Sequence, residues 1–160
     1  GKEYGVMHRQ NRSENEVVVV VKPWSDEKKP VLKEQYRKAI EDYIEPYRLI
    51  NTKVTVESAR YAGICVHGKI ALEQDSPKTR KAVLERISRE LSYTERKHPF
   101  GTVISYGQLF TALENTEGVK KVLELNLERT GNAARKNDRG DVLLDADALG
   151  ILEGTDLEFC

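Results

Sequence analysis

The three histidines are the residues of this 160-residue chain best suited to hold a metal ion or to move a proton. His8, His67 and His98 are far apart, and none has a histidine or a carboxylate four residues later. That spacing is the one with which a helix presents two ligands to one metal ion. We therefore interpret each histidine as a structural or exposed side chain, and the sequence predicts no metal site.

Cys65 is a candidate nucleophile, because His67 lies on the same face of a predicted strand. Their backbone positions are about 7 Å apart at ~3.3 Å per residue. A half-buried thiol beside a surface histidine explains the same pattern without catalysis, and we favour that interpretation. Cys160 forms no C-x-x-C motif with Cys65, so we expect two reduced structural thiols and no catalytic residue.

The glycines and the acidic residues form no recognisable ligand-binding motif. G-x-G-x-x-G and G-x-x-x-x-G-K-[ST] are both absent, so the sequence predicts no nucleotide cofactor. Four aspartates lie close together late in the chain, at Asp138, Asp141, Asp145 and Asp147. They lack the regular spacing and the central glycine of a calcium loop. We interpret them as solvated loop charges, and we expect no cofactor.

Positive and negative charges balance, with 26 Lys plus Arg against 26 Asp plus Glu. No global field therefore favours nucleic acid or an anionic membrane. A small basic cluster occurs late in the chain, at Arg129, Arg135, Lys136 and Arg139. It leaves a ferredoxin-like nucleic-acid-binding module as the alternative function, although the strands carry few aromatic residues for base stacking. No apolar run approaches the ~20 residues of a membrane span, and we find no signal-peptide pattern.

The first half of the chain predicts strand, helix, strand and strand. The run of valines from Val17 to Val21 predicts a central strand buried on both faces, because side chains branched at Cβ favour the pleated backbone. Apolar residues then recur at every fourth position and predict a helix over residues 31–45, which Pro46 ends. Its inward stripe comprises Leu32, Tyr36, Ile40 and Ile44, widened by Ala39 and Tyr43. Strands over 52–57 and 60–73 follow, joined by a short turn in an antiparallel pair.

The second half predicts two capped helices and a last main strand. Ser76 is the expected N-cap of a helix that begins at Pro77 and whose inward stripe is Val83, Ile87 and Leu91.

Residues 99–129 then predict a rigid loop, a short helix, a glycine turn and a strand. Ser105 and Gln108 stand in the S-x-x-Q relation of a capping box, and Gly118 ends the helix. Residues 130–140 predict an exposed loop, and 142–144 and 155–159 predict short terminal strands around a connector at 148–152.

This order of elements predicts an α+β fold. We expect a ferredoxin-like βαββαβ sandwich, in which helices cover one face of an antiparallel sheet, with an extra short helix and a small C-terminal β appendage. The domain organisation is then a lead-in arm (1–16), an α+β core domain (17–129) and a loop with the C-terminal appendage (130–160). The helix-free face of such a sheet must be covered by the arms or by another subunit.

The ordered set of these segments resembles proteins of the baseplate J-like family, especially those described as baseplate assembly proteins. The resemblance lies in VVVVVKPWSDEKKPVLKEQYRKAIEDYIEPYRLINTKVTVESARYAGICVHGKI, in PFGTVISYGQLFTALENTEGVKKVLELNLER and in ARKNDRGDVLLDADALGILEGTDLEF. It covers about residues 16–159. The order and the spacing of the segments carry it, since no single motif is decisive.

The resemblance implies a structural, non-enzymatic subunit of the baseplate wedge of a contractile phage tail, prophage or related injection system. The expected partners are other wedge and hub proteins and further copies of this chain, with no nucleic acid, membrane or small-molecule substrate. The expected location is the virion tail baseplate, after assembly in the bacterial cytoplasm. Because the chain begins with Gly1, we expect it to be the C-terminal portion of a longer protein.

The candidate interfaces are the helix-free sheet face, the PFGTVISYG loop and the C-terminal appendage. Large aromatic side chains are the commonest energetic anchors of protein interfaces. The candidate anchors are Trp24, Phe100 and Tyr106.

Overall fold

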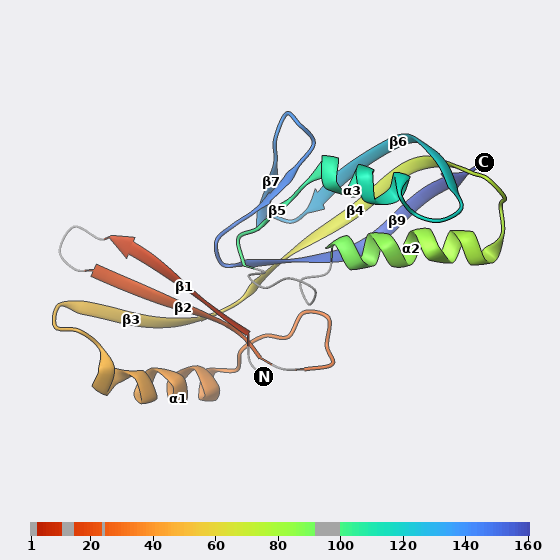
Figure 1. The fold of residues 1–160 in the computed structure, drawn as a ribbon. Helices are drawn as coiled ribbons and strands as arrows, with labels where there is room; N and C mark the ends of the chain where they lie inside the picture. Colours follow the sequence, from red (N-terminus) through yellow and green to blue (C-terminus); the bar gives the residue numbers. More distant parts are fainter. Residues whose placement is uncertain (1–2, 11–14, 24, 92–99) are drawn as a thin grey trace. The chain divides into compact units, whose positions relative to one another are not determined.

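The computed structural model describes residues 3–10, 15–23, 25–91 and 100–160, and for residues 3–10 the backbone alone. In it the chain forms two compact units, residues 1–60 and residues 61–160 (Figure 1). The predicted core domain of residues 17–129 therefore spans the division between the two units. Each unit has its own sheet and its own core.

Unit 1 is a three-stranded sheet with one helix. Its strands lie in the order β1-β2-β3, with β1 (Glu3–Gln10) antiparallel to β2 (Asn15–Lys22) and β2 parallel to β3 (Thr52–Ser58). A parallel pair needs a crossover connection. The segment containing α1 (Glu34–Ile44) and the 3₁₀ turn η1 (Glu45–Tyr47) supplies it. The predicted arm of residues 1–16 is thus wrong in part, because residues 3–10 form a strand.

The valine run occupies the central strand β2, as the sequence predicts. Val18 and Val20 are buried on one face of the sheet and Val21 on the other. On the Val21 face lies a small core, built from Val19, Val21, Leu32, Ile40, Ile44 and Val56.

Helix α1 begins later than the sequence predicts and presents a different face. Leu32 precedes the helix, and its amide N–H donates to the Ser58 hydroxyl at 2.9 Å. Tyr36 and Tyr43, which were expected in the inward stripe, are exposed. Successive residues turn by about 100° around a helix axis. The two tyrosines therefore lie beside the inward pair Ile40 and Ile44 rather than between them.

Unit 2 is built around β4 (Arg60–Leu72), the middle strand of the sheet β6-β4-β9. Strand β6 (Val119–Thr130) is antiparallel to β4. Strand β9 (Ala148–Phe159) runs parallel to β4, because the Cys160 N–H donates to the Ile70 carbonyl at 3.1 Å and the Leu72 N–H donates to the Cys160 carbonyl at 2.8 Å. Cys160 thus bonds to two residues of β4, Ile70 and Leu72, that lie two positions apart, and this is the hydrogen-bond pattern of a parallel pair.

A second small sheet completes unit 2. Its order is β5-β8-β7, with β5 (Val103–Ile104) and β7 (Ala134–Lys136) both antiparallel to β8 (Val142–Leu144). Strand β8 has the bounds that the sequence predicts. The connector expected at 148–152 is instead part of β9, a strand of the main sheet.

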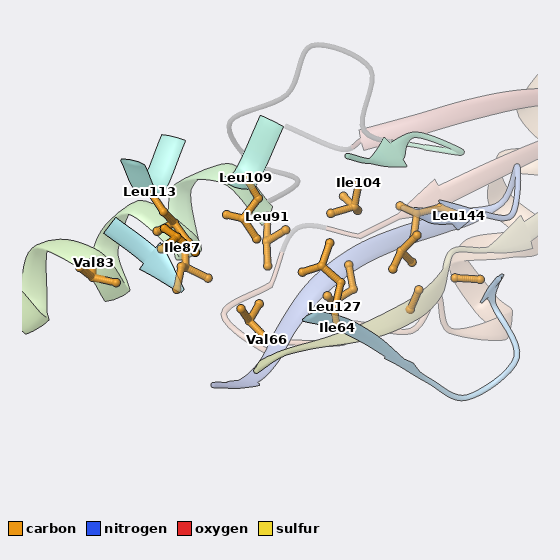
Figure 2. Close-up of a cluster of buried hydrophobic side chains, with 14 of the residues drawn as sticks. Ile64, Val66, Val83, Ile87, Leu91, Ile104, Leu109, Leu113, Leu127 and Leu144 are labelled. Atoms are coloured by element: carbon orange, nitrogen blue, oxygen red, sulfur yellow. The ribbon is translucent and has the colours of Figure 1, made fainter. Parts of the chain in front are cut away.

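Two helices bury one face of the main sheet of unit 2. Helix α2 (Pro77–Leu91) contributes the predicted stripe, and its Ser76 cap accepts the Thr79 N–H at 3.2 Å. Helix α3 (Tyr106–Glu114) packs beside it. Figure 2 shows their side chains converging with those of the strands, at Ile64, Val66, Val83, Ile87, Leu91, Ile104, Leu109, Leu113, Leu127 and Leu144.

The α+β class is confirmed, but the ferredoxin-like connectivity is wrong. The expected turn between residues 57 and 60 would have folded β4 back against β3. That stretch contains no Gly, Asn or Asp to form a tight turn, and only Ala59 separates β3 from β4. The Ala59 N–H donates to the Val21 carbonyl at 3.0 Å, which extends the β3–β2 pairing instead. The strands therefore form sheets in two units rather than one.

Candidate functional site

The three aromatic residues predicted as interface anchors differ in how far the structure describes and buries them. Trp24 lies outside the described residues. Phe100 is partly exposed in a turn, and Tyr106 is partly buried at the start of α3, where its ring lies 6.1 Å from that of Phe110. Tyr106 also packs against the core of unit 2.

The PFGTVISYG segment, whose described part is residues 100–107, is held by specific polar contacts. Ser105 caps α3 as predicted, and its hydroxyl accepts the Gln108 N–H at 3.2 Å. The Tyr106 N–H donates to the Asp141 carboxylate at 2.8 Å. This bond, together with one from the Asn137 side chain, lowers the pKa of Asp141. The hydrogen bond between Tyr106 and Asp141 therefore joins this segment to the turn that precedes β8.

The helix-free face of the main sheet carries polar and charged side chains along β4 and β9. By alternation along β4, this face bears Cys65, His67 and Lys69. His67 Nδ1 lies 3.5 Å from the Asp156 carboxylate, and Lys69 Nζ lies 3.8 Å from that of Glu158.

In these contacts the partner of His67 is Asp156 of β9, and not Cys65. The contacts of the described residues bring no catalytic partner to Cys65. His98 and the side chain of His8 lie outside the described residues.

The basic cluster near β7 is partly neutralised by its neighbours. Lys136 Nζ pairs with Glu128 at 3.1 Å and also donates to Asn126 at 2.7 Å. Hydrogen bonds from Asn126 and Lys136 lower the pKa of Glu128. Arg129 donates to the Gly131 carbonyl. Two of the four cations of this cluster, on which the alternative of nucleic-acid binding rests, therefore have partners within the chain.

A group of exposed apolar side chains lies along α1, η1 and the residues that follow η1 in unit 1, and the sequence analysis missed it. It consists of Tyr36, Tyr43, Tyr47, Leu49 and Ile50, which we call the α1 surface. The rings of Tyr43 and Tyr47 lie 6.0 Å apart. The available signal was the choice of tyrosine, an amphipathic residue, at positions flanking the two isoleucines of the helix.

Beside the α1 surface lies a shallow hollow of about 350 Å³. Its lining is mostly polar, and consists of Glu45, Arg48, Asn51, Thr52, Lys53 and Val54. Arg48 Nε donates to Glu45 at 2.7 Å, and Arg48 Nη1 donates to the Thr52 carbonyl at 3.3 Å. The hollow therefore carries charges of both signs.

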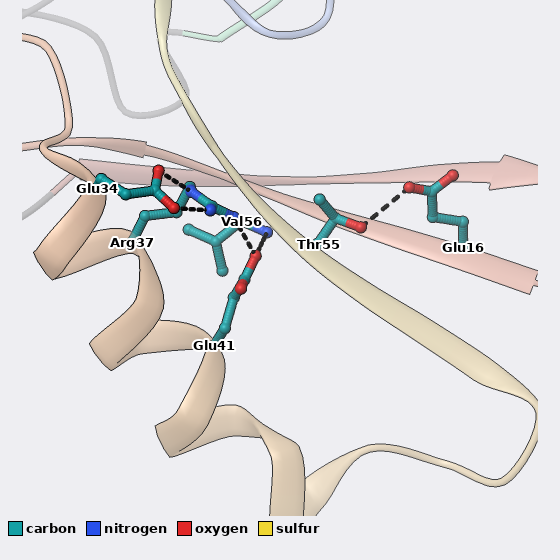
Figure 3. A network of polar contacts seen from close by, with 6 residues as sticks. All are labelled: Glu16, Glu34, Arg37, Glu41, Thr55 and Val56. Atoms are coloured by element: carbon teal, nitrogen blue, oxygen red, sulfur yellow. Dashed lines mark hydrogen bonds and ion pairs between the residues drawn. The ribbon is translucent and has the colours of Figure 1, made fainter.

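Polar contacts hold α1 against the sheet (Figure 3). Arg37 binds Glu34 on one side, which lowers the pKa of Glu34, and binds Glu41 on the other at 2.8 Å. The Glu41 carboxylate also accepts the Val56 N–H of β3 at 3.2 Å. On the same strand the Thr55 hydroxyl donates to Glu16 of β2 at 3.0 Å.

The described residues contain no group of three or more His, Cys, Asp or Glu side chains placed to share a metal ion. Among the helices of the described part, none has the length and apolar character needed to cross a membrane.

Comparison with known proteins gives a likeness in fold. No family model matches the sequence, and no curated protein matches it. A chain in the cryo-EM structure of the anti-feeding prophage (AFP) baseplate, 6-fold symmetrised, matches 91% of this chain with a TM-score of 0.65 and 14% sequence identity. This chain covers 30% of that longer chain. The two share a fold over nearly the whole length of the protein described above.

Proposed function

We propose that this chain is a structural subunit of the baseplate of a contractile injection particle, such as a phage tail or a prophage-derived device. The observation that carries the proposal is the shared fold, which extends over 91% of this chain and includes both units. The sequence resemblance narrows the proposal to the baseplate J-like family and to a role in wedge assembly, without enzymatic turnover. The site of action would be the tail baseplate, after assembly in the bacterial cytoplasm.

The surfaces of the two units support a role based on protein contacts. A subunit of a multi-protein assembly needs interfaces with apolar centres and polar rims. Unit 1 offers the exposed α1 surface, and unit 2 offers a polar face on which His67 and Lys69 lie beside the carboxylates of Asp156 and Glu158. The expected partners are other wedge and hub proteins together with further copies of this chain.

Isolation of intact particles tests the proposal. A tagged form of this chain is expressed in the bacterium that produces the particle, and the particles are purified under conditions that retain baseplates. We expect the tag at the baseplate end in labelled electron micrographs, while an identically tagged cytosolic protein is absent. Particles that assemble fully and never contain the chain would contradict the proposal.

The alternative function, a nucleic-acid-binding module, was based on a ferredoxin-like sheet, and the observed sheets do not have that connectivity. Lys136 and Arg129 of its basic cluster are occupied by Glu128 and by a backbone carbonyl. A gel-shift assay with RNA and single-stranded DNA at low salt tests this alternative directly. We expect no shift, and a salt-dependent shift would restore it.

A further inference from the structure

Strand β9 is an outer strand of the main sheet of unit 2. It lies beside β4, while β6 lies on the other side of β4 (Figure 1). In the part of the chain that the structure describes, no further strand pairs with β9. An outer strand presents a row of unpaired N–H and carbonyl groups, which form a template for another strand.

Strands β4 and β9 keep one register over the last part of β9. Asp156 contacts His67 and Glu158 contacts Lys69, at the same spacing along both strands. The backbone bonds of Cys160 to β4 continue this spacing to the end of the chain. The direction of each backbone group in this part of β9 therefore follows from the position of its residue.

The backbone groups of Thr155, Leu157 and Phe159 lie on the outer side of β9. The N–H and the carbonyl of Cys160 both bond to β4, and neighbouring residues of a strand direct these groups to opposite sides. The side chains of Leu157 and Phe159 pack against the core of unit 2, as this alternation requires. Among the described residues, none forms a hydrogen bond with the outer backbone groups of these three.

The chain closes amides of two other strands with its own side chains. Glu41 accepts the Val56 N–H of β3, and Glu114 accepts the Val122 N–H of β6. Residues 155–159 of β9 have no such contact from the described residues. They also include no lysine or proline, which commonly protect edge strands. This edge is therefore left open.

The open edge is held in place from the helix side. The guanidinium of Arg80 on α2 lies over the ring of Phe159, 5.0 Å from its centre. Two hydrogen bonds of 2.6 Å hold Arg80 against Asp75. A partner strand would therefore meet a preformed edge, which lowers the free-energy cost of association.

We propose that the outer edge of β9, residues 155–159, pairs with an extended segment of another baseplate subunit in which basic residues alternate with apolar ones. The proposal rests on the proposed baseplate function, since that function supplies the partner. Addition of a strand to an open sheet edge is a recurring mode of peptide recognition. Backbone hydrogen bonds give the affinity, and alternate side chains give the specificity.

The side chains of β9 determine the chemistry of this partner. On the helix-free face, Asp156 and Glu158 expose 87% and 72% of their side chains. Their neighbours on β4 compensate these charges only in part, because Lys69 is a cation but His67 is charged only when it is protonated. Side chains opposite each other on paired strands lie about 5 Å apart, so lysine or arginine of the added strand would meet the two carboxylates. On the other face, apolar side chains would extend the core of unit 2.

The same charges argue against pairing of β9 with β9 of a second copy. A twofold antiparallel pair centred on Leu157 would place Asp156 of one copy opposite Glu158 of the other. Like charges directly opposite each other destabilise a strand pair. The partner is therefore a segment with a different sequence from β9.

Hydrogen exchange measured by nuclear magnetic resonance on the 160-residue chain tests the open edge. Without a partner, the amides of Thr155, Leu157 and Phe159 should exchange at least about tenfold faster than those of Asp156 and Glu158, which face β4. The binding probe is an acetylated and amidated peptide of seven residues in which valine and lysine alternate. With a dissociation constant of about 0.1 mM, this peptide at about 1 mM should slow exchange at the three outward amides about tenfold.

Two peptides and two kinds of variant make the test specific. The same peptide with glutamate in place of lysine should protect these amides at least about tenfold less, because it places like charges opposite each other. Thr155→Pro removes one outward N–H at an edge position where proline is tolerated, and should weaken binding of the lysine peptide at least about tenfold. Glu85→Gln neutralises an exposed carboxylate of α2 and is the matched control, which should bind like the unmodified chain.

Far-ultraviolet circular dichroism establishes that the variants are folded. If Thr155→Pro unfolds, the double variant Asp156→Asn with Glu158→Gln takes its place, and it should bind the lysine and glutamate peptides equally. Two results in the unmodified chain would overturn the proposal. One is an absence of protection by the lysine peptide at about 1 mM, and the other is equal protection by the two peptides.

The natural partner is identified in assembled particles. A photoreactive phenylalanine analogue replaces Thr155 in the tagged chain, purified particles are irradiated, and the crosslinked segment is sequenced by mass spectrometry. We expect a segment of another subunit with lysine or arginine at alternate positions. A crosslink to β9 of a second copy, or to a segment without this alternation, would overturn the proposal.

The outcomes separate this proposal from the proposed function. Particles that contain the chain but give no crosslink from position 155 would overturn the proposed edge pairing and leave the proposed function standing. If the chain never enters particles, the proposed function falls. The exchange measurements then decide alone whether the β9 edge accepts a basic strand.

Discussion

Glu41 is predicted to secure the outer edge of the unit 1 sheet. Strand β3 is an edge strand, and the Val56 N–H, directed away from β2, donates to the Glu41 carboxylate at 3.2 Å. Glu41→Ala removes this acceptor and leaves the Val56 amide to solvent or without a partner. The substitution also removes the ion pair with Arg37 that orients the helix.

The expected cost is that of one hydrogen bond to a charged group, about 1.5–3 kcal/mol. Hydrogen exchange measured by nuclear magnetic resonance reports it at the amide itself. Because 1.4 kcal/mol corresponds to a factor of ten, the Val56 amide should exchange about 10 to 100 times faster in Glu41→Ala. Glu41→Gln retains an oxygen acceptor but not the charge, so its exchange rate should lie between those of the two other proteins.

Unit 2 contains a matched control. The Glu114 carboxylate of α3 accepts the Val122 N–H of β6 at 3.0 Å, next to an irregularity in the β4–β6 register. Glu114→Ala should accelerate exchange at Val122 and leave Val56 unchanged, and Glu41→Ala should do the reverse. An unchanged Val56 exchange rate in a folded Glu41→Ala protein would refute the argument that the carboxylate protects this edge.

Three further predictions concern unit 2. Ser105→Ala should lower the free energy of unfolding by about 1 kcal/mol in denaturant titration, because it removes the N-cap of α3; an unchanged midpoint would contradict this role. Gly68→Ala should destabilise by about 1–3 kcal/mol, since a Cβ would lie 2.5 Å from the Glu124 carbonyl oxygen and force β4 and β6 apart; a thermal midpoint equal to that of the unmodified protein would oppose this. The lowered pKa of Asp141 contributes stability that is complete above the ordinary aspartate pKa and is lost as pH falls through the lower folded-state pKa. Asp141→Asn should therefore flatten the acid limb of the stability profile, and an identical acid limb in both proteins would argue against the contact.

The sequence predicts a structural feature correctly where contacts between neighbouring residues determine it. The Ser76–Pro77 start of α2 and the Ser105 cap of α3 both form the hydrogen bonds that their spacing predicts. Gly118 does adopt a positive φ of 88°, but α3 ends at Glu114 with Asn115 as its C-cap, so the prediction that Gly118 ends the helix is wrong. The valine run was also assigned correctly to a central strand.

Partner choice between strands could not be predicted, because it depends on distant segments. Alternation identifies β3 and β4 as strands but does not show whether they pair with each other. The stretch around Ala59 contains no Gly, Asn or Asp, which is a weak signal in sequence that β3 and β4 belong to different units. Strand β9 was divided into a connector and a short strand, since Gly150 and Gly154 interrupt its apolar pattern.

The exposed apolar side chains of α1 could not be predicted from periodicity either. The apolar stripe of α1 is real, but it is wider than the sheet of unit 1 can cover, so Tyr36 and Tyr43 remain exposed. A helical pattern gives the width of an apolar face and not the number of partners that share it.

The pairing of β4 with β9 has a consequence for synthesis of the chain. Contacts in unit 1 join residues within the first 60, so that unit can complete its sheet early. The Cys160 thiol and the Ile70 carbonyl that meet at the end of the β4–β9 pair are 90 residues apart. At about 5–20 residues per second, one side of β4 waits roughly 5–20 s for its partner strand on the ribosome. We expect unit 2 to be the part of the nascent chain that most needs protection from misassociation.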